Sequence, residues 1–319
     1  MTQQLDALVV GAGVIGLTTA IALAEAGLAT RVRAAAPPGR TTSFAAGAIW
    51  GPVRTGTSSR VLEWSRVGLE VMSALADDPR AGIRAVSGIE VSAVAADPPE
   101  WAGLLPGARR LGPGELPAGY ASGWRYTAPV AAMPRYLDYL AGRLRAAGGT
   151  LDTASPVGSL RDPGLGAPVV VNCAGIGARE LVPDPAVVPV RGQVVVVANP
   201  GIEEFFRAPG DGPESVYMFP HGDVLLLGGS ADEGDWDLSP RESVTTRILA
   251  DCAQIEPRLR GTAVLDERVG LRPGRPQARL ESQALGDGRV LWHNYGHGGA
   301  GVTLAWGCAR EIAAAVAGS

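Results

Sequence analysis

A glycine-rich turn near the start of the chain constrains the fold more than any other feature of the sequence. The apolar run 5–10 stops at Gly11-Ala-Gly-Val-Ile-Gly16, a helical pattern continues to Ala26, and Gly27 follows as a C-cap. A second short strand is expected over 30–34. This order predicts a β-α-β unit of the dinucleotide-binding type, because glycine lets the backbone turn and approach a phosphate. Free N–H groups at the start of the helix would bind the pyrophosphate.

The end of the second predicted strand leaves the kind of dinucleotide open. An acidic residue usually stands there to hold the ribose hydroxyls. Here no acidic residue occurs between Glu25 and Glu63, and three alanines occupy 34–36. Arg31 and Arg33 precede them and would accept a 2′-phosphate, which favours NADP, or else they are solvated residues at a strand end.

Composition removes whole classes of mechanism. All 28 basic residues are arginine, so Schiff-base, covalent pyridoxal and P-loop lysine chemistry are excluded. The length of 319 residues, with 46% of them hydrophobic, permits a sizeable core in one large or two ordinary domains. A net charge of −4 argues against nucleic acid or an anionic membrane as partner.

Cysteine and histidine usage bears on the compartment and on metals. The 3 cysteines are far apart without CxxC spacing, which favours a reducing compartment and no disulfide framework. The 3 histidines, His221, His293 and His297, could not alone complete a usual metal cluster, so no metal is expected. No apolar run is long enough to span a membrane, and no basic leader precedes the first strand. We expect a soluble protein of the bacterial cytoplasm.

The remaining pattern predicts an α/β fold with two interleaved domains. A fully apolar strand over 168–173 would return to the nucleotide, and a closing helix over 303–317 would bury one face. Helices are also expected over 61–75 and 133–147, strands of a second sheet over 193–197 and 224–227, and a long loop over 41–60. A doubly wound, Rossmann-like nucleotide-binding domain is predicted over 1–55, 145–185 and 263–319. A mixed-sheet α+β substrate domain is predicted over 56–144 and 186–262.

Several segments, in this order along nearly the whole chain, carry a specific resemblance. They are 9–20 (VVGAGVIGLTTA), 41–47 (TTSFAAG), 171–175 (VNCAG), 191–193 (RGQ), 217–220 (YMFP), 270–281 (GLRPGRPQARLE), 293–303 (HNYGHGGAGVT) and 306–308 (WGC). Together they resemble the D-amino-acid oxidase family. The resemblance implies a non-covalently bound FAD and oxidation of D-amino acids to imino acids. These hydrolyse to 2-oxo acids and ammonia, while oxygen becomes hydrogen peroxide.

The resemblance also implies roles for particular residues. Arg272 matches the arginine that binds the substrate carboxylate, and a planar guanidinium suits that task. Tyr217 matches a tyrosine that assists on the same carboxylate, and Gly299 matches a glycine whose carbonyl accepts from the substrate amine. The Cα hydride would pass directly to flavin N5, so orientation supplies most of the catalysis. His293 and His297 are then expected to form structural hydrogen bonds.

The resemblance further implies which residues surround the cofactor and the substrate side chain. The expected FAD-binding residues are Gly11, Gly13, Val14, Ile15, Gly16, Thr41, Thr42, Ser43, Ala46, Gly47, Ala48, Val157, Cys173, Ala174, Gly175, Arg272, Gly298, Gly299, Gly301, Val302 and Thr303. Phe219, Ile49 and Trp50 are expected to line an apolar pocket, which favours neutral D-amino acids. The short stretch 209–215 indicates a reduced active-site lid.

The sequence leaves several related and unrelated functions open. D-aspartate oxidases of the family need a second cation to bind the side-chain carboxylate of the substrate. Arg207 would supply this cation, although the favoured interpretation is that Arg207 is a solvated loop residue. A glycine oxidase, an NADP-dependent reductase using Arg31 and Arg33, and a nucleotide-sensing binding module are also compatible with the residues. The expected partners are a small D-amino acid and oxygen, with a homodimer left open.

Overall fold

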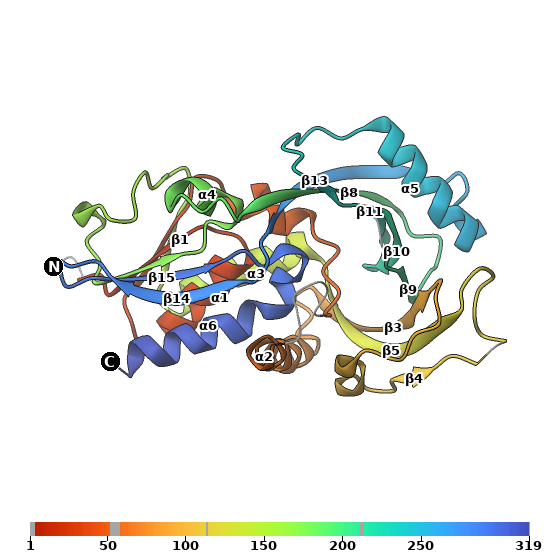
Figure 1. The fold of residues 1–319 in the computed structure, drawn as a ribbon, viewed down its shortest axis with the longest axis horizontal. Helices are drawn as coiled ribbons and strands as arrows, with labels where there is room; N and C mark the ends of the chain where they lie inside the picture. Colours follow the sequence, from red (N-terminus) through yellow and green to blue (C-terminus); the bar gives the residue numbers. More distant parts are fainter. Residues whose placement is uncertain (1–3, 52–57, 113, 211–213, 319) are drawn as a thin grey trace.

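The computed structural model describes residues 4–51, 58–112, 114–210 and 214–318. Two β-sheets occupy the two ends of an elongated molecule, with the N- and C-terminal regions both at the end that holds the smaller sheet (Figure 1). Among the described residues no helix is long and apolar enough to cross a membrane.

The smaller sheet contains the predicted β-α-β unit. Its 6 strands run in the order β14-β15-β7-β1-β2-β6. They are β1 (Ala7–Val10), β2 (Thr30–Arg33), β6 (Thr150–Asp152), β7 (Val169–Asn172), β14 (Arg279–Ala284) and β15 (Val290–Tyr295). The chain pairs β1 in parallel with both β2 and β7, and every residue of β1 is buried. The short apolar runs of the sequence therefore become central strands of a parallel sheet, as expected for strands covered on both faces.

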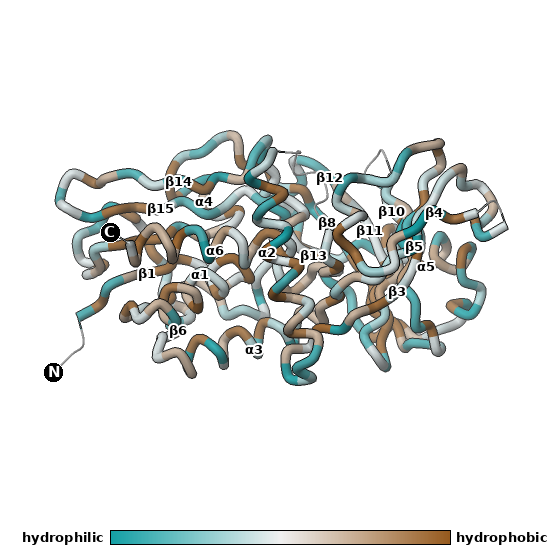
Figure 2. Tube along the Cα trace, turned by 90° about the horizontal axis from the view of Figure 1, so that it is seen from below, coloured by the Kyte–Doolittle hydropathy of each residue, from teal (hydrophilic) through white to brown (hydrophobic). Residues whose placement is uncertain are grey.

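Four helices pack against one another. They are α1 (Val14–Glu25), α2 (Ser59–Leu75), α3 (Met133–Ala146) and α6 (Gly301–Ala317). Two of them, α1 and α3, also contact strands of this sheet. The helix α6 packs on α1 and α2, and α1 also contacts α3. Brown, hydrophobic segments recur along α6 in Figure 2. Leu304, Cys308 and Ile312 are fully buried and Val316 is partly buried, so the predicted apolar face of this helix is confirmed.

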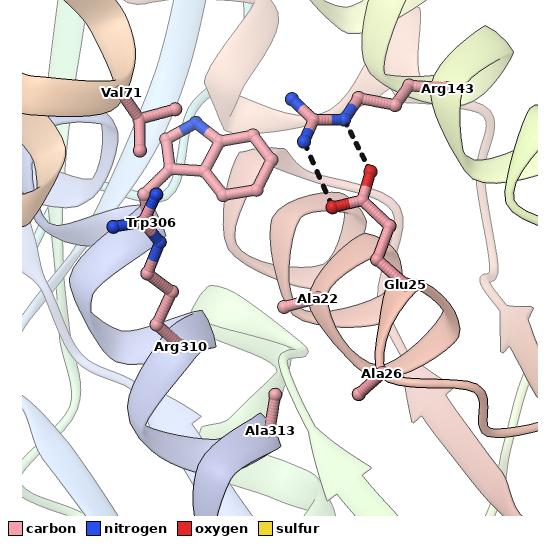
Figure 3. A pocket seen from close by; sticks show the side chains of 8 residues that line it. All are labelled: Ala22, Glu25, Ala26, Val71, Arg143, Trp306, Arg310 and Ala313. Carbon is pink, nitrogen blue, oxygen red and sulfur yellow. Dashed lines mark hydrogen bonds and ion pairs between the residues drawn. The ribbon is translucent and has the colours of Figure 1, made fainter.

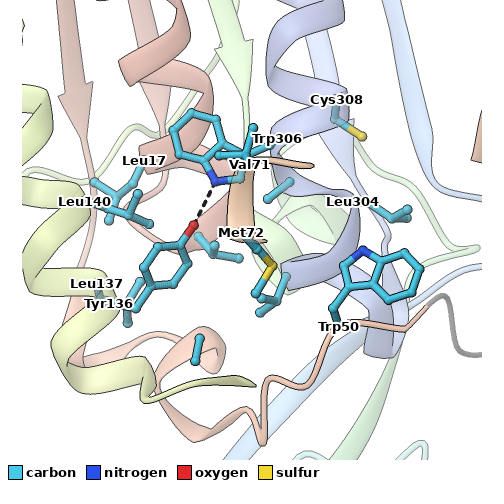
Figure 4. Packing of buried hydrophobic residues seen from close by; sticks show 14 of the residues in the cluster. Leu17, Trp50, Val71, Met72, Tyr136, Leu137, Leu140, Leu304, Trp306 and Cys308 are labelled. Carbon is cyan, nitrogen blue, oxygen red and sulfur yellow. Dashed lines mark hydrogen bonds between the residues drawn. The ribbon is translucent and has the colours of Figure 1, made fainter. Parts of the chain in front are cut away.

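A polar contact ties the helix core together. The indole Nε1 of Trp306 on α6 donates to the hydroxyl of Tyr136 on α3 at 2.8 Å, within an apolar cluster that includes Leu17 and Leu140 (Figure 4). Because both polar atoms are buried, each satisfies the other and neither is left without a partner.

The larger sheet has 9 strands in the order β12-β8-β11-β10-β9-β3-β5-β4, with β13 paired to β8. The strands are β3 (Ile83–Ser92), β4 (Arg109–Arg110), β5 (Ser122–Ala131), β8 (Val188–Ala198), β9 (Phe205–Ala208), β10 (Glu214–Pro220), β11 (Val224–Ser230), β12 (Asp232–Glu233) and β13 (Val264–Gly274). Only the β3–β9 pair is parallel among the pairings of the described residues in this sheet. The helix α5 (Glu242–Ile255) packs on β8, β10 and β11.

The structure confirms the predicted fold class, an α/β unit joined to a mixed sheet. Within the predicted loop 41–60 a 3₁₀ turn forms over Thr42–Ala45, and α2 begins at Ser59. The strand β13 hydrogen-bonds to β8 in the larger sheet, although the predicted boundary at 263 assigns it to the nucleotide-binding domain. The boundary at 55/56 lies outside the described residues, and the two-domain division stays a prediction.

Candidate active site

A cavity of about 1300 Å³ runs along the carboxyl ends of β1, β2 and β7 and reaches the larger sheet. Ligand pockets are usually about 300–1,000 Å³, so this one can hold more than a single small molecule. One end is lined by Gly11, Gly13 and the alanines 34–36, and the other by Tyr217 and Arg272.

The glycine-rich turn brings the backbone too close for side chains. Gly11 has φ +115°, and a Cβ placed on it would lie 2.4 Å from the carbonyl oxygen of Cys173 on the neighbouring strand end. A Cβ on Gly16 would lie 1.9 Å from the carbonyl oxygen of Gly11. Gly16 is therefore a packing residue behind the turn, and it does not line the cavity.

The start of α1 is suited to an anion. Gly13 caps this helix without a side-chain acceptor, and the first turn contains no acidic residue. The N–H of Val14 donates to Ser43 Oγ at 3.0 Å, while Gly13, Val14 and Ile15 all lie on the cavity wall. A helix N-terminus with a glycine approach binds phosphate, so this cradle fits the pyrophosphate of FAD.

The arginines that favoured NADP do not reach this cavity. Arg31 lies 3.7 Å from Asp152 in an exposed ion pair, and Arg33 donates to Ser155 Oγ at 3.0 Å. Neither side chain lines the cavity, whereas Arg40, for which the sequence predicted no role, does. The NADP interpretation depended on Arg31 and Arg33, and the structure does not support it.

Arg272 lies on β13 at the far end of the cavity. Its Nη1 donates to the carbonyl oxygen of Ser230 at 2.9 Å. The guanidinium lies flat against Gly192 of β8, since a Cβ there would be 2.4 Å from both Nη1 and Nη2. A backbone carbonyl on one side and a bare glycine on the other thus fix the orientation of the guanidinium, a planar donor suited to a carboxylate.

Tyr217 on β10 is packed against a second pair of glycines. A Cβ on Gly228 or Gly229 of β11 would lie within 2.0–2.5 Å of its phenol ring or hydroxyl. Burial raises the pKa of Tyr217, and the guanidinium of Arg272 acts in the opposite direction. The hydroxyl therefore stays protonated at neutral pH and can donate a hydrogen bond near Arg272.

The apolar side of this end is formed by aromatic packing. Tyr217 and Phe219 stack with ring centroids 4.8 Å apart and an interplanar angle of 16°. A Cβ on Gly47 would lie 2.9 Å from the Phe219 ring, and Ile49 also lies on the wall.

Trp50 is not part of this pocket, and its expected role there is corrected. Its side chain is fully buried in the core beside Leu304, and its Nε1 donates to the carbonyl oxygen of Ser65 at 3.0 Å (Figure 4). Successive residues of an extended segment point to opposite sides, so Ile49 and Trp50 cannot both face the cavity.

The start of α6 forms another part of the wall. A 3₁₀ turn over Gly298–Ala300 leads into the helix. A Cβ added to Gly299 would lie 3.9 Å from Arg272 Cδ, so the two residues are neighbours. Thr303 Oγ1 bridges the N–H and the carbonyl oxygen of Gly51, both at 3.1 Å. These contacts bring the helix N-terminus and Arg272 to the same region of the cavity.

The two histidines of segment 293–303 are neutral at pH 7. Burial lowers the pKa of His293 and of His297 to about 4. His293 lies off the cavity wall and packs edge-on against Tyr295, while His297 lies on the wall with Nε2 3.6 Å from Cys308 Sγ. Groups with so low a pKa are weak bases. The expected hydrogen bond is found for His297, whereas Nδ1 of His293 is buried without a partner among the described residues.

Most of the expected site residues lie together. Every residue expected to bind FAD except Gly16 lines the cavity, as do Tyr217, Phe219 and Ile49. Their individual roles stay predictions. Residues 211–213 of the expected reduced lid lie outside the described residues. Among those described, no group of 3 or more His, Cys, Asp or Glu side chains could hold a metal.

Sequence reasoning missed several residues of the wall. Gly192 and Ser230 hold Arg272, and the RGQ segment that contains Gly192 was the available signal. The expectation of a solvated Arg207 is wrong, because this residue lies on β9 with 7% exposure and faces the cavity.

A second, smaller hollow of about 310 Å³ lies between α1, α3 and α6 (Figure 3). Glu25 accepts from Arg143 Nε and Nη2 at 2.7 and 3.0 Å, and Arg143 stacks on Trp306 with its Cζ 4.9 Å from the ring centroid. Glu25 and Arg143 are thus paired with each other, and Arg310, which also lines the hollow, pairs with Glu70 at 3.3 Å.

The fold and the cavity define a two-sheet protein of the dinucleotide-binding class whose cavity extends from the glycine-rich turn to Arg272 and Tyr217. A family model described as FAD dependent oxidoreductase (DAO) matches residues 6–315, and the chain belongs to that family. It is 50% identical to a D-amino-acid oxidase of Rubrobacter xylanophilus, covering 98% of this chain and 96% of the relative.

Two further comparisons agree. A D-amino-acid oxidase of Streptomyces coelicolor is 46% identical, with 97% of this chain and 95% of the relative covered. The solved structure of glycine oxidase from Geobacillus kaustophilus superposes with a TM-score of 0.81 at 22% identity, covering 98% of this chain and 94% of that one. The latter likeness concerns the fold alone.

Proposed function

We propose that the protein oxidises D-amino acids with neutral side chains to 2-oxo acids and ammonia, with oxygen reduced to hydrogen peroxide. The main support for this proposal is that Arg272, Tyr217 and Gly299 lie together at one end of the cavity. The glycine-rich turn that fits the pyrophosphate lies at the other end. The relatives named D-amino-acid oxidase support the same activity.

Arg272 and Tyr217 would bind the α-carboxylate of the substrate. The guanidinium offers two parallel N–H groups to a carboxylate, and the protonated Tyr217 hydroxyl adds a third donor. Since Ser230 and Gly192 hold the guanidinium in place, little side-chain freedom is lost when the substrate binds.

Gly299 would accept a hydrogen bond from the substrate amine through its carbonyl oxygen. Holding both the carboxylate and the amine leaves the Cα hydrogen pointing in one direction, and orientation of this kind supplies much of a catalytic rate. FAD, when bound, would supply the acceptor for the hydride that leaves Cα. The neutral amine supplies the electron pair that forms the C=N bond, so the weakly basic histidines are not required.

Acidic substrates are the second candidate, favoured by one observation. Arg207 lies on the cavity wall as a register partner of Tyr217 on the neighbouring strand. A buried cation at that position is what a side-chain carboxylate would need. Oxidation rates for D-alanine, D-aspartate and glycine distinguish these activities from that of a glycine oxidase.

Replacement of Arg272 tests the proposal. Arg272→Ala removes the main carboxylate donor, so KM for D-alanine should rise by several orders of magnitude, equivalent to roughly 3–5 kcal/mol if the pair is desolvated. Arg66→Ala is the matched control, because Arg66 pairs with Glu63 on the surface of α2. An increase below about tenfold for Arg272→Ala contradicts the assignment.

Cytoplasmic localisation and a homodimeric state remain predictions. All described cysteines are free and buried, which is compatible with a reducing compartment. Light scattering on the purified protein measures the oligomeric state directly.

A further inference from the structure

A buried ion pair lies next to Tyr217, with Arg207 on the cavity wall and Glu90 behind it. Glu90 on β3 and Arg207 on β9 are register partners, and Arg207 Nη1 donates to Glu90 Oε2 at 2.9 Å. The hydroxyl of Tyr126 donates to the same oxygen at 2.7 Å. Glu90 and Arg207 are each 7% exposed and Tyr126 is 1% exposed, so the three groups form one desolvated cluster.

The order of the strands places this cluster next to the carboxylate-binding groups. Arg272 lies on β13 beside β8, Tyr217 lies on β10, and β9 with Arg207 follows directly. Arg207 and Tyr217 are register partners, so their side chains share one face of the sheet about 5 Å apart at Cβ. Arg207 is thus the charged side chain next to Tyr217 on this face of the sheet, and it lies on the cavity wall.

The charge of Arg207 is cancelled within the protein. Burial lowers the pKa of Arg207, but the Glu90 carboxylate raises it, and the net direction is upward. Arg207 therefore stays protonated, and its charge is balanced by a carboxylate that is as buried as itself. A second carboxylate brought to this place by a substrate would be desolvated beside a like charge, which is strongly unfavourable.

We propose that Glu90 determines the charge of the side chain that the enzyme accepts. By neutralising Arg207, Glu90 turns a site for acidic side chains into one for neutral side chains. The guanidinium still carries N–H donors beyond the one bound to Glu90, so it favours an uncharged acceptor such as a side-chain amide oxygen. This inference rests on the proposed oxidation of D-amino acids and names the substrate class within it.

D-Asparagine and D-aspartate form the sharpest pair of probes, because they have the same shape and differ in charge. For the wild-type holoenzyme, kcat/KM for D-asparagine should exceed that for D-aspartate by more than about tenfold. A wild-type enzyme that oxidises D-aspartate as well as D-asparagine overturns the inference, whether or not any variant folds.

Glu90→Gln removes the charge and keeps the contacts. The amide oxygen can still accept from both Tyr126 and Arg207, while the positive charge of Arg207 becomes available to the substrate. The ratio of kcat/KM for D-aspartate to that for D-asparagine should rise by at least about tenfold. In the double variant Glu90→Gln with Arg207→Met this gain should disappear, because the cation is gone.

The control and the remaining outcomes complete the test. Glu204→Gln makes the same substitution in an exposed ion pair with Arg125 and should leave the ratio unchanged. A folded, FAD-loaded Glu90→Gln variant with the wild-type ratio overturns the inference. If the wild type oxidises none of D-alanine, D-asparagine and D-aspartate, the proposed function is contradicted. If it oxidises D-asparagine and D-aspartate equally well, only the role of Glu90 is contradicted.

Discussion

Gly192→Ala tests how the larger sheet positions Arg272, the arginine proposed to bind the substrate carboxylate. The new Cβ would lie 2.4 Å from Nη1 and Nη2 of Arg272 and 2.5 Å from Cζ, whereas ordinary contacts begin at 3.4 Å. The guanidinium must therefore retreat by at least about 1 Å, and its 2.9 Å hydrogen bond to Ser230 is strained or lost. Misplacement by about 1 Å can cost a factor of about 10² in rate, so kcat/KM for D-alanine should fall by about 10- to 100-fold.

The assay is oxygen consumption with D-alanine, together with the flavin content and melting temperature of each variant. Gly192 does not have a positive φ, so alanine is compatible with its backbone, and FAD content should stay at the wild-type value. Gly142→Ala in α3 is the matched control, because nothing lies within 4 Å of a Cβ added there. A Gly192→Ala enzyme with kcat/KM within about threefold of wild type would refute the positioning argument.

Three further predictions concern packing, the cofactor cradle and pH. Trp50→Phe should lower the free energy of unfolding by about 1–3 kcal/mol, because the indole loses its hydrogen bond to the Ser65 carbonyl and part of its buried packing, and should leave KM unchanged; a large change in KM would contradict the placement of Trp50 outside the substrate pocket. Gly11→Ala, with its Cβ 2.4 Å from the Cys173 carbonyl oxygen, should purify without flavin absorbance, and a fully yellow variant would contradict the cradle. Burial lowers the pKa of His297 from 6.5 to about 4, so the unfolded chain binds the extra proton and stability falls as pH drops below about 6.5. His297→Gln should reduce the loss of stability between pH 7 and pH 5 by about 2 kcal/mol in urea titrations, and an unchanged loss would contradict the assignment.

Local signals predicted the cofactor end of the molecule well. The turn 11–16 needs glycine because β1, α1 and the end of β7 approach within contact distance. The glycines that meet this need are close together in the sequence, so the motif can be recognised there. The apolar spacing of α6 is likewise a property of one segment, since residues four apart share a helix face. Both features could therefore be predicted without knowledge of the tertiary fold.

The substrate end depends on contacts between distant segments. Arg207 belongs to β9, a strand of 4 residues, and its burial depends on Glu90, 117 residues away in the sequence. Nothing near Arg207 in the sequence distinguishes it from a solvated loop residue. Trp50 was misplaced for a similar reason, because its partners Ser65 and Trp101 lie on other elements.

The most direct test of the account is the absorbance spectrum of the purified protein, loaded with FAD, before and after anaerobic addition of D-alanine. The account predicts a yellow flavin spectrum that bleaches with the D-isomer and is unchanged by L-alanine, because the proposed contacts of Arg272 and Tyr217 with the carboxylate and of Gly299 with the amine would present the Cα hydrogen of only the D-isomer to the flavin. A flavin spectrum that D-alanine, D-asparagine and D-aspartate all leave unchanged would contradict the proposed oxidation of D-amino acids.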